Sequence, residues 1–197
     1  MRAALAFRAL AVAAMLASAC SARRSTDRAA TPTSYATRIV LAPDAIAVVS
    51  PLGAGGALPE EIPLGRDAVV LLLHFKPTWD LAYIMAAFLT LDPHPDAPPQ
   101  GAASTVSVAR VLEPWSPAEV TYARLPKLSA PEVRADVTTV IDAPLRVDVT
   151  AIVRRWARER PSDHGLAIFA VSESGAGATY ATGLTGARGP RLDVYIR

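Results

Sequence analysis

The sequence predicts an all-β protein, an antiparallel jelly-roll β-sandwich that contains one short amphipathic helix. From residue 37 onward the apolar segments are short, and proline and glycine separate them. Several segments alternate between apolar and polar residues, as in 133–141, 145–149 and 191–196. Such alternation is typical of antiparallel sheets that pack on one face and meet water on the other. Many short strands with a single helix late in the chain indicate a sandwich of this type.

The first element in chain order is an export signal over residues 1–19. Arg2 and Arg8 are followed by an apolar run over residues 9–17, and small residues come after this run. This is the layout of a cleaved signal peptide. The apolar run is too short for a permanent transmembrane helix, which needs about 20 residues.

Two interpretations of the cleavage site remain open. The segment Ala17-Ser18-Ala19 fits an ordinary signal peptidase, after which the protein would be secreted. The overlapping segment LASAC resembles the lipobox of bacterial lipoproteins, in which the cysteine becomes acylated. Cys20 is the only cysteine of the chain, and this favours lipid attachment because exported proteins rarely keep a free thiol. Ser21 then favours the outer membrane of a Gram-negative cell envelope over the inner membrane.

Residues 20–35 are polar and contain Pro32, so we expect a flexible tether that reaches roughly 20 Å. The folded domain is expected to occupy residues 36–197. Removal of residues 1–19 takes away two of the 20 Lys and Arg residues and none of the 18 Asp and Glu residues, so the charges of the mature chain balance. A neutral chain without a concentrated basic field argues against a nucleic-acid partner.

Within the domain, proline- and glycine-rich segments at 51–65 and 92–104 are expected to be long loops. The segment 80–91 is ambiguous, because its good helix formers and the possible N-cap Asp80 favour a helix by intrinsic propensity. The expected strands are 38–41, 45–49, 68–75, 105–112, 120–122, 133–141, 145–149, 166–171, 178–182 and 191–196.

The single helix is predicted to start near Thr150, which can cap it. Helical spacing places Ile152, Val153, Trp156 and Ala157 on one stripe. We expect this stripe to cover one end of the sandwich. Three arginines, Arg154, Arg155 and Arg158, fall on the opposite side, where they form either a solvated helix face or an anion site, and the amphipathic pattern favours the first.

The helical segment also carries a family resemblance. The stretch VDVTAIVRRWARERPSDHGLAI resembles the DVT-x-x-V-x-x-W helix and the following x-x-x-G-L-x-I strand of the DNRLRE-domain family. Three further stretches, VVLLLHF, VSVARVLEPWSPAEVTYARLP and GPRLDVYIR, resemble other motifs of this family in the same order. Its members are extracellular β-sandwiches classed near carbohydrate-binding modules. The resemblance spans residues 66–197 and implies a strand for 80–91.

Catalytic and metal-binding motifs are missing from the sequence. His74, His94 and His164 are the only histidines, and none has a second ligand at metal-binding spacing. No Gly-x-Ser-x-Gly elbow occurs, and GAGG at 53–56 lacks the Lys-Ser/Thr of a phosphate loop. The sequence therefore predicts no enzyme activity, no metal and no cofactor.

Sugar binding by a β-sandwich uses aromatic rings that stack on the apolar faces of pyranoses, with polar groups beside them. Trp79 is the first candidate for such a contact and Tyr180, after a glycine-rich turn, is the second. Trp115 matches a structural tryptophan of the resembled family and is expected to be core. The predicted function is a non-catalytic envelope lipoprotein that binds polysaccharide or glycan. The alternative is a structural or protein-interaction domain whose partner is an envelope protein.

Lipid attachment predicts that Cys20→Ala moves the protein out of the membrane fraction, because the acyl chains supply the anchoring energy. Cell fractionation followed by immunoblotting measures this partition for wild type and variant. A variant that partitions with the membrane as wild type does would contradict the anchor, and ordinary cleavage at Ala19 would then be favoured.

Overall fold

The computed structural model describes residues 37–52, 58–66, 68–76, 83–96, 103–138, 143–159, 164–172, 177–184 and 189–197. The predicted signal peptide, the tether with Cys20, and Trp79 lie outside the described residues. Within the described ranges, no helix has the length and apolar character that a membrane span requires.

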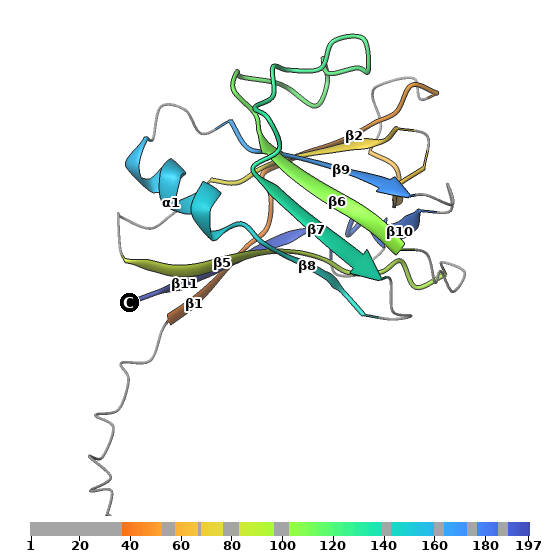
Figure 1. Cartoon of the computed structure of the whole chain (residues 1–197). Helices are drawn as coiled ribbons and strands as arrows, with labels where there is room; N and C mark the ends of the chain where they lie inside the picture. The colour runs from red at the N-terminus through yellow and green to blue at the C-terminus, as the bar shows by residue number, and fades with distance from the viewer. Residues whose placement is uncertain are drawn as a thin grey trace, which may run out of the picture. The chain divides into compact units, whose positions relative to one another are not determined.

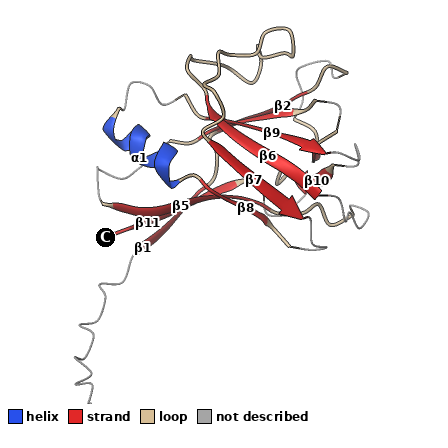
Figure 2. Cartoon of the chain, viewed as in Figure 1, coloured by secondary structure: helices blue, strands red, loops and turns tan. Residues whose placement is uncertain are grey.

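Two antiparallel sheets form the layers of a sandwich (Figures 1 and 2). One sheet has the strand order β1-β11-β5-β8, and the other has the order β2-β4-β9-β6-β7, while β10 and β3 form a separate pair. The strands are β1 (Thr37–Leu41), β2 (Ala45–Val49), β3 (Glu61–Leu64), β4 (Val70–His74), β5 (Ile84–Leu91), β6 (Ala103–Arg110), β7 (Val133–Thr138), β8 (Leu145–Asp148), β9 (Leu166–Ser172), β10 (Ala178–Ala181) and β11 (Arg191–Ile196). The predicted all-β, antiparallel architecture is confirmed.

The main core lies between the two sheets, where the inward residues of their strands meet. Leu71 and Leu73 of β4 and Leu89 and Leu91 of β5 are all almost fully buried in one apolar cluster. The other face of β4 is buried as well, because Val70 and its neighbours belong to a second cluster beneath the segment between β6 and β7. The five-stranded sheet is thus covered on both faces around β4.

The ambiguous segment forms a strand and not a helix, as far as it is described. Ile84–Leu91 is β5, which pairs with β11 on one side and with β8 on the other. A helix here would satisfy its own backbone groups but would leave β8 without a partner and β11 paired only with β1. Tertiary pairing therefore overrides the helix propensity of this segment.

The single helix of the described chain, α1 (Thr150–Arg158), covers one end of the sandwich (Figure 1). Ile152, Val153 and Trp156 are buried, with exposed fractions of 0%, 1% and 5%, and they extend the main core. The predicted apolar stripe is confirmed. The expected capping role of Thr150 is wrong, because Thr150 is the first helical residue and Val149 precedes it without a side-chain cap.

The hydroxyl group of Thr150 bonds to β5 instead of to the helix. It accepts the backbone N–H of Ala87 at 2.9 Å, and the N–H of Val149 donates to the carbonyl oxygen of Ala87 at 2.9 Å. Beyond this point Arg154 donates to the carbonyl oxygens of Ile84 and Met85, each at 2.9 Å. The start of the helix therefore continues the pairing that β8 makes with the edge of β5.

The three arginines of the helix thus differ in their surroundings. Arg154 bonds to the backbone of β5 and is nevertheless exposed, as expected for a solvated face. Arg155 lies 3.8 Å from the Glu132 carboxylate. Arg158 is exposed in the last turn, as expected for a solvated face.

We predict that Trp156→Ala lowers the free energy of unfolding by about 3 to 5 kcal/mol, because it leaves a cavity in the main core. Trp156→Phe should cost less, about 1 to 2 kcal/mol, because the buried indole N–H has no hydrogen-bond partner among the described residues and much of the ring is retained. Urea unfolding measures both values. Arg158→Ala is the control on the exposed side and should change the free energy by less than about 0.5 kcal/mol. Equal stability of Trp156→Ala and wild type would contradict the burial of this side chain.

Candidate functional site

The segment between β6 and β7 is held in a fixed shape by its own hydrogen bonds. Its two arms approach each other where Leu112 donates its N–H to the carbonyl oxygen of Lys127 at 2.8 Å. The N–H of Lys127 donates to the Glu113 carboxylate, also at 2.8 Å. A turn follows in which the N–H of Val120 donates to the carbonyl oxygen of Ser116 at 3.0 Å. These contacts order an irregular loop, and the strand expected at 120–122 is wrong, because Thr121 makes only an isolated bridge with Arg124.

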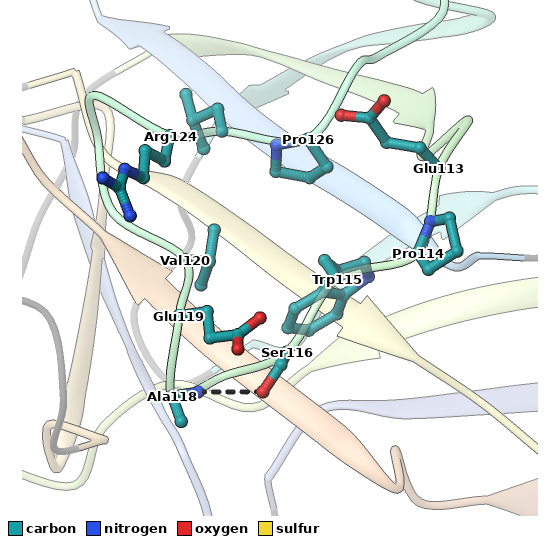
Figure 3. Close-up of a pocket in the computed structure, with 10 residues that line it drawn as sticks. Glu113, Pro114, Trp115, Ser116, Ala118, Glu119, Val120, Arg124 and Pro126 are labelled. Atoms are coloured by element: carbon teal, nitrogen blue, oxygen red, sulfur yellow. Dashed lines mark hydrogen bonds between the residues drawn. The ribbon is translucent and has the colours of Figure 1, made fainter.

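This loop encloses a groove of about 660 Å³, drawn in Figure 3. Trp115 is half-buried in its wall and packs against the second apolar cluster, which fixes one side of the ring. Its indole N–H donates to the carbonyl oxygen of His164 at 2.7 Å, which sets the orientation of the ring. The groove is lined by Glu113, Pro114, Trp115, Ser116, Ala118, Glu119, Val120, Arg124, Leu125 and Pro126.

Two charged side chains of the groove have no partner in the part of the chain that the structure describes. The carboxylate of Glu119 lies beside the Trp115 ring, and the guanidinium group of Arg124 lies across the groove from it (Figure 3). Both residues are exposed. An aromatic ring flanked by an unpaired acceptor and an unpaired donor can bind a polyhydroxylated ligand, because hydroxyl groups donate to carboxylates and accept from guanidinium groups.

The two aromatic residues predicted to contact sugar do not form this site. Trp79 lies outside the described residues. Tyr180 belongs to β10, where it pairs with Ile62 of β3, and it is only 3% exposed. Its ring has no free face for stacking on a sugar, so we correct the expectation of an exposed contact. Burial raises the pKa of Tyr180 to about 12, since the phenolate is poorly solvated there.

Trp115, which is expected from the sequence to be core, is half-buried in the structure. Its predicted structural contact is present, since it packs on the apolar cluster, yet the same ring also lines the groove. Period-two or helical spacing could not reveal this, because the loop follows neither. The available signal was the pair of glutamates at 113 and 119 around the tryptophan in a proline-containing segment.

The histidines do not gather into a metal site within the described residues, where no group of three metal-ligating side chains occurs. His74 lies 2.6 Å from the Asp44 carboxylate at the surface. His94 is buried beside its own turn and accepts the N–H of Asp96 at 3.3 Å. His164 contributes its carbonyl oxygen to Trp115.

The outer face of the four-stranded sheet is the other aromatic and charged surface, but its groups satisfy one another. Asp193 of β11, only 3% exposed, bonds to Arg38 at 2.7 Å and to the Thr90 hydroxyl at 3.1 Å. The guanidinium group of Arg146 lies 3.7 Å from the centre of the Phe88 ring, which it covers. The groove offers unpaired groups where this face does not, and it is the stronger candidate.

Comparison with models of protein families and with curated proteins finds no match for this chain.

The buried phenol of Tyr180 predicts a pH dependence of stability. The folded state holds this proton up to a pH of about 12, whereas an unfolded tyrosine releases it near pH 10. Stability is therefore full below about pH 10 and falls as the pH rises towards 12, by about 2 to 3 kcal/mol in total. Urea unfolding from pH 8 to 11 should show a shallower alkaline loss for Tyr180→Phe than for wild type. Tyr122→Phe, an exposed control, should keep the wild-type slope, and an unchanged slope in Tyr180→Phe would refute the assignment.

Proposed function

We propose that this protein is a non-catalytic cell-envelope lipoprotein whose β-sandwich binds polysaccharide or glycan in the groove between β6 and β7. The observation that carries the proposal is the combination of Trp115, Glu119 and Arg124 around one groove. The ring is held by a hydrogen bond and by packing, whereas the two charged groups have no partner among the described residues. A site of this kind is already ordered before a ligand arrives, which lowers the entropy cost of binding.

A neutral or mixed-charge sugar suits the groove better than a strongly charged ligand. Glu113 and Glu119 contribute negative charge and Arg124 contributes positive charge, so no single sign dominates. The exposed part of the indole supplies apolar surface for a pyranose ring. The open groove fits a chain that passes through it better than a small molecule that must be enclosed.

The fold supports the same class of function. Eight strands, β1, β4, β5, β6, β7, β8, β9 and β11, form the orders 1-8-3-6 and 2-7-4-5 when they are numbered among themselves along the chain. These orders support a jelly-roll connectivity, in which the chain crosses between the two sheets after every strand except the hairpin of strands 4 and 5. This agrees with the resemblance to the DNRLRE-domain family and its carbohydrate-binding relatives.

The cellular setting of the proposal comes from the N-terminal sequence. Acylation at Cys20 would attach the protein to the envelope, and to the outer membrane in a Gram-negative cell. Cleavage at Ala19 without acylation would instead release a secreted form. In either case the domain works outside the cytoplasm, where polysaccharides are abundant.

The test is retention of the protein on polysaccharides from bacterial envelopes, followed by a glycan array for any that retain it. The double variant Glu119→Gln, Arg124→Gln should lower the affinity for glycan by at least about tenfold, because two charge-assisted hydrogen bonds to the ligand are weakened. Both side chains are exposed, so the fold should persist. A matched double variant, Glu61→Gln with Arg134→Gln, carries the same charge changes on exposed strand residues and should bind as wild type does.

Three outcomes would count against the proposal in different ways. If wild type retains no glycan, a structural or protein-interaction domain in an envelope assembly becomes the better assignment. If the groove variant binds as tightly as wild type, the groove is not the site. If Trp79→Ala abolishes binding while the groove variant retains it, the sugar contact is at the tryptophan first predicted from sequence.

A further inference from the structure

One end of the four-stranded sheet brings together the first described strand and the last residues of the chain (Figure 1). Thr37 of β1 pairs with Ile196 of β11, and Ile196 in turn pairs with Ile84 of β5. The N–H of Arg197 donates to the carbonyl oxygen of Tyr83 at 3.1 Å. The predicted tether therefore joins the domain beside Tyr83 and Arg197.

Large apolar side chains are exposed at this same end. Tyr83 is 83% exposed and Met85 is 44% exposed. With Ile84, Arg154 and Arg197 they line a shallow hollow of about 650 Å³. We call Tyr83, Met85, Arg154 and Arg197 the tether-side patch. The exposed tyrosine and methionine offer apolar surface that a partner can cover.

The patch also carries positive charge that the described residues do not neutralise. Arg154 donates to the carbonyl oxygens of Ile84 and Met85, and these neutral acceptors leave its charge uncompensated. Among the described residues neither Arg154 nor Arg197 forms an ion pair with a carboxylate. The surface thus combines apolar side chains with the uncompensated cation of Arg154 and with the guanidinium group of Arg197, which shares its residue with the terminal carboxylate.

We propose that the tether-side patch docks on anionic phospholipid headgroups of the membrane that holds the acyl anchor. This inference rests on the proposed lipoprotein, because the anchor is what brings a membrane to this end of the domain. The chain from Cys20 to Thr37 has an average reach of about 20 to 25 Å, so the patch stays close to the bilayer surface. Tyrosine is suited to the headgroup region, and each arginine near an anionic surface contributes about 1 kcal/mol.

Docking by this patch is compatible with glycan binding by the groove. The patch lies at the end of the four-stranded sheet, whereas the groove lies in the loop that covers the outer side of the five-stranded sheet (Figure 1). A domain held at the membrane through the patch would keep the groove accessible to polysaccharide.

The experiment uses the exported mature chain with Cys20→Ala, so that its membrane binding does not depend on acylation. Met85→Cys then introduces the single thiol of the chain, which is labelled with a polarity-sensitive fluorophore. Vesicles of phosphatidylcholine with one-third phosphatidylglycerol should shift the emission to the blue, and pure phosphatidylcholine vesicles should not. The same label at Val171→Cys, an exposed apolar position on β9 of the other sheet, should remain unshifted.

The contribution of the patch is measured by further substitution. Arg197→Gln should weaken binding to the anionic vesicles about fivefold, as expected for the loss of one cation at the surface. Adding Tyr83→Ser to Arg197→Gln should weaken binding to the anionic vesicles further. Arg134→Gln, on the outer face of β7, removes one positive charge elsewhere and should leave the affinity within a factor of two.

Several results would overturn the proposal without touching the lipoprotein assignment. One is that the emission of the label at position 85 does not shift at millimolar anionic lipid. Another is that the labels at positions 85 and 171 shift equally. The third is that the double variant Arg197→Gln, Tyr83→Ser binds the anionic vesicles as tightly as wild type does. Fractionation of wild type and Cys20→Ala in high salt, which screens headgroup binding by the patch, tests the anchor separately. If the patch binds vesicles but Cys20 is never acylated, the proposed lipid anchor is rejected and the proposed membrane-binding surface is retained.

Discussion

The pairing of β5 is the constraint on which the rest of the structure depends. This strand is central in its sheet, and each of its buried backbone groups that lacks a hydrogen-bond partner would lower the stability of the fold by about 1 to 3 kcal/mol. β8 is too short to pair with all of it, so the chain satisfies Ala87 through Val149 and Thr150, and Ile84 through Arg154. These bonds hold α1 against the end of the sandwich. The burial of Ile152, Val153 and Trp156 in the main core holds the helix in the same position.

A second chain of contacts connects the core to the groove. Leu73 of β4 has its carbonyl oxygen so close to Gly165 that an added Cβ there would lie 2.1 Å from it, and Gly165 also has a φ of 100°. Glycine is required at this point because any side chain would clash and be strained. The preceding residue, His164, then presents its carbonyl oxygen to Trp115. The orientation of the ring in the groove thus depends on a close backbone approach inside the five-stranded sheet.

The sequence predicted those parts of the fold in which local pattern and tertiary environment agree, such as the alternating β11 and the apolar stripe of α1. It failed where a distant partner decides. Thr150 has a good capping side chain, but its hydroxyl oxygen accepts the N–H of Ala87 in β5 instead of an N–H of the helix. Tyr180 follows a glycine-rich turn and looked exposed, but its strand pairs with β3 and its side chain is buried in the main core. The groove was missed because the path of the loop depends on its two arms, which meet only in the folded chain.

The arginines around the four-stranded sheet are held by different kinds of partner. Arg38 and Asp193 lie 2.7 Å apart on the outer face, so each cancels the charge of the other. Arg154 is held just as firmly, but by carbonyl oxygens, which orient a guanidinium group without neutralising it. An arginine used in this way stabilises the strand edge and still projects a positive field. The fold can therefore build a cationic patch from a residue whose first role is structural.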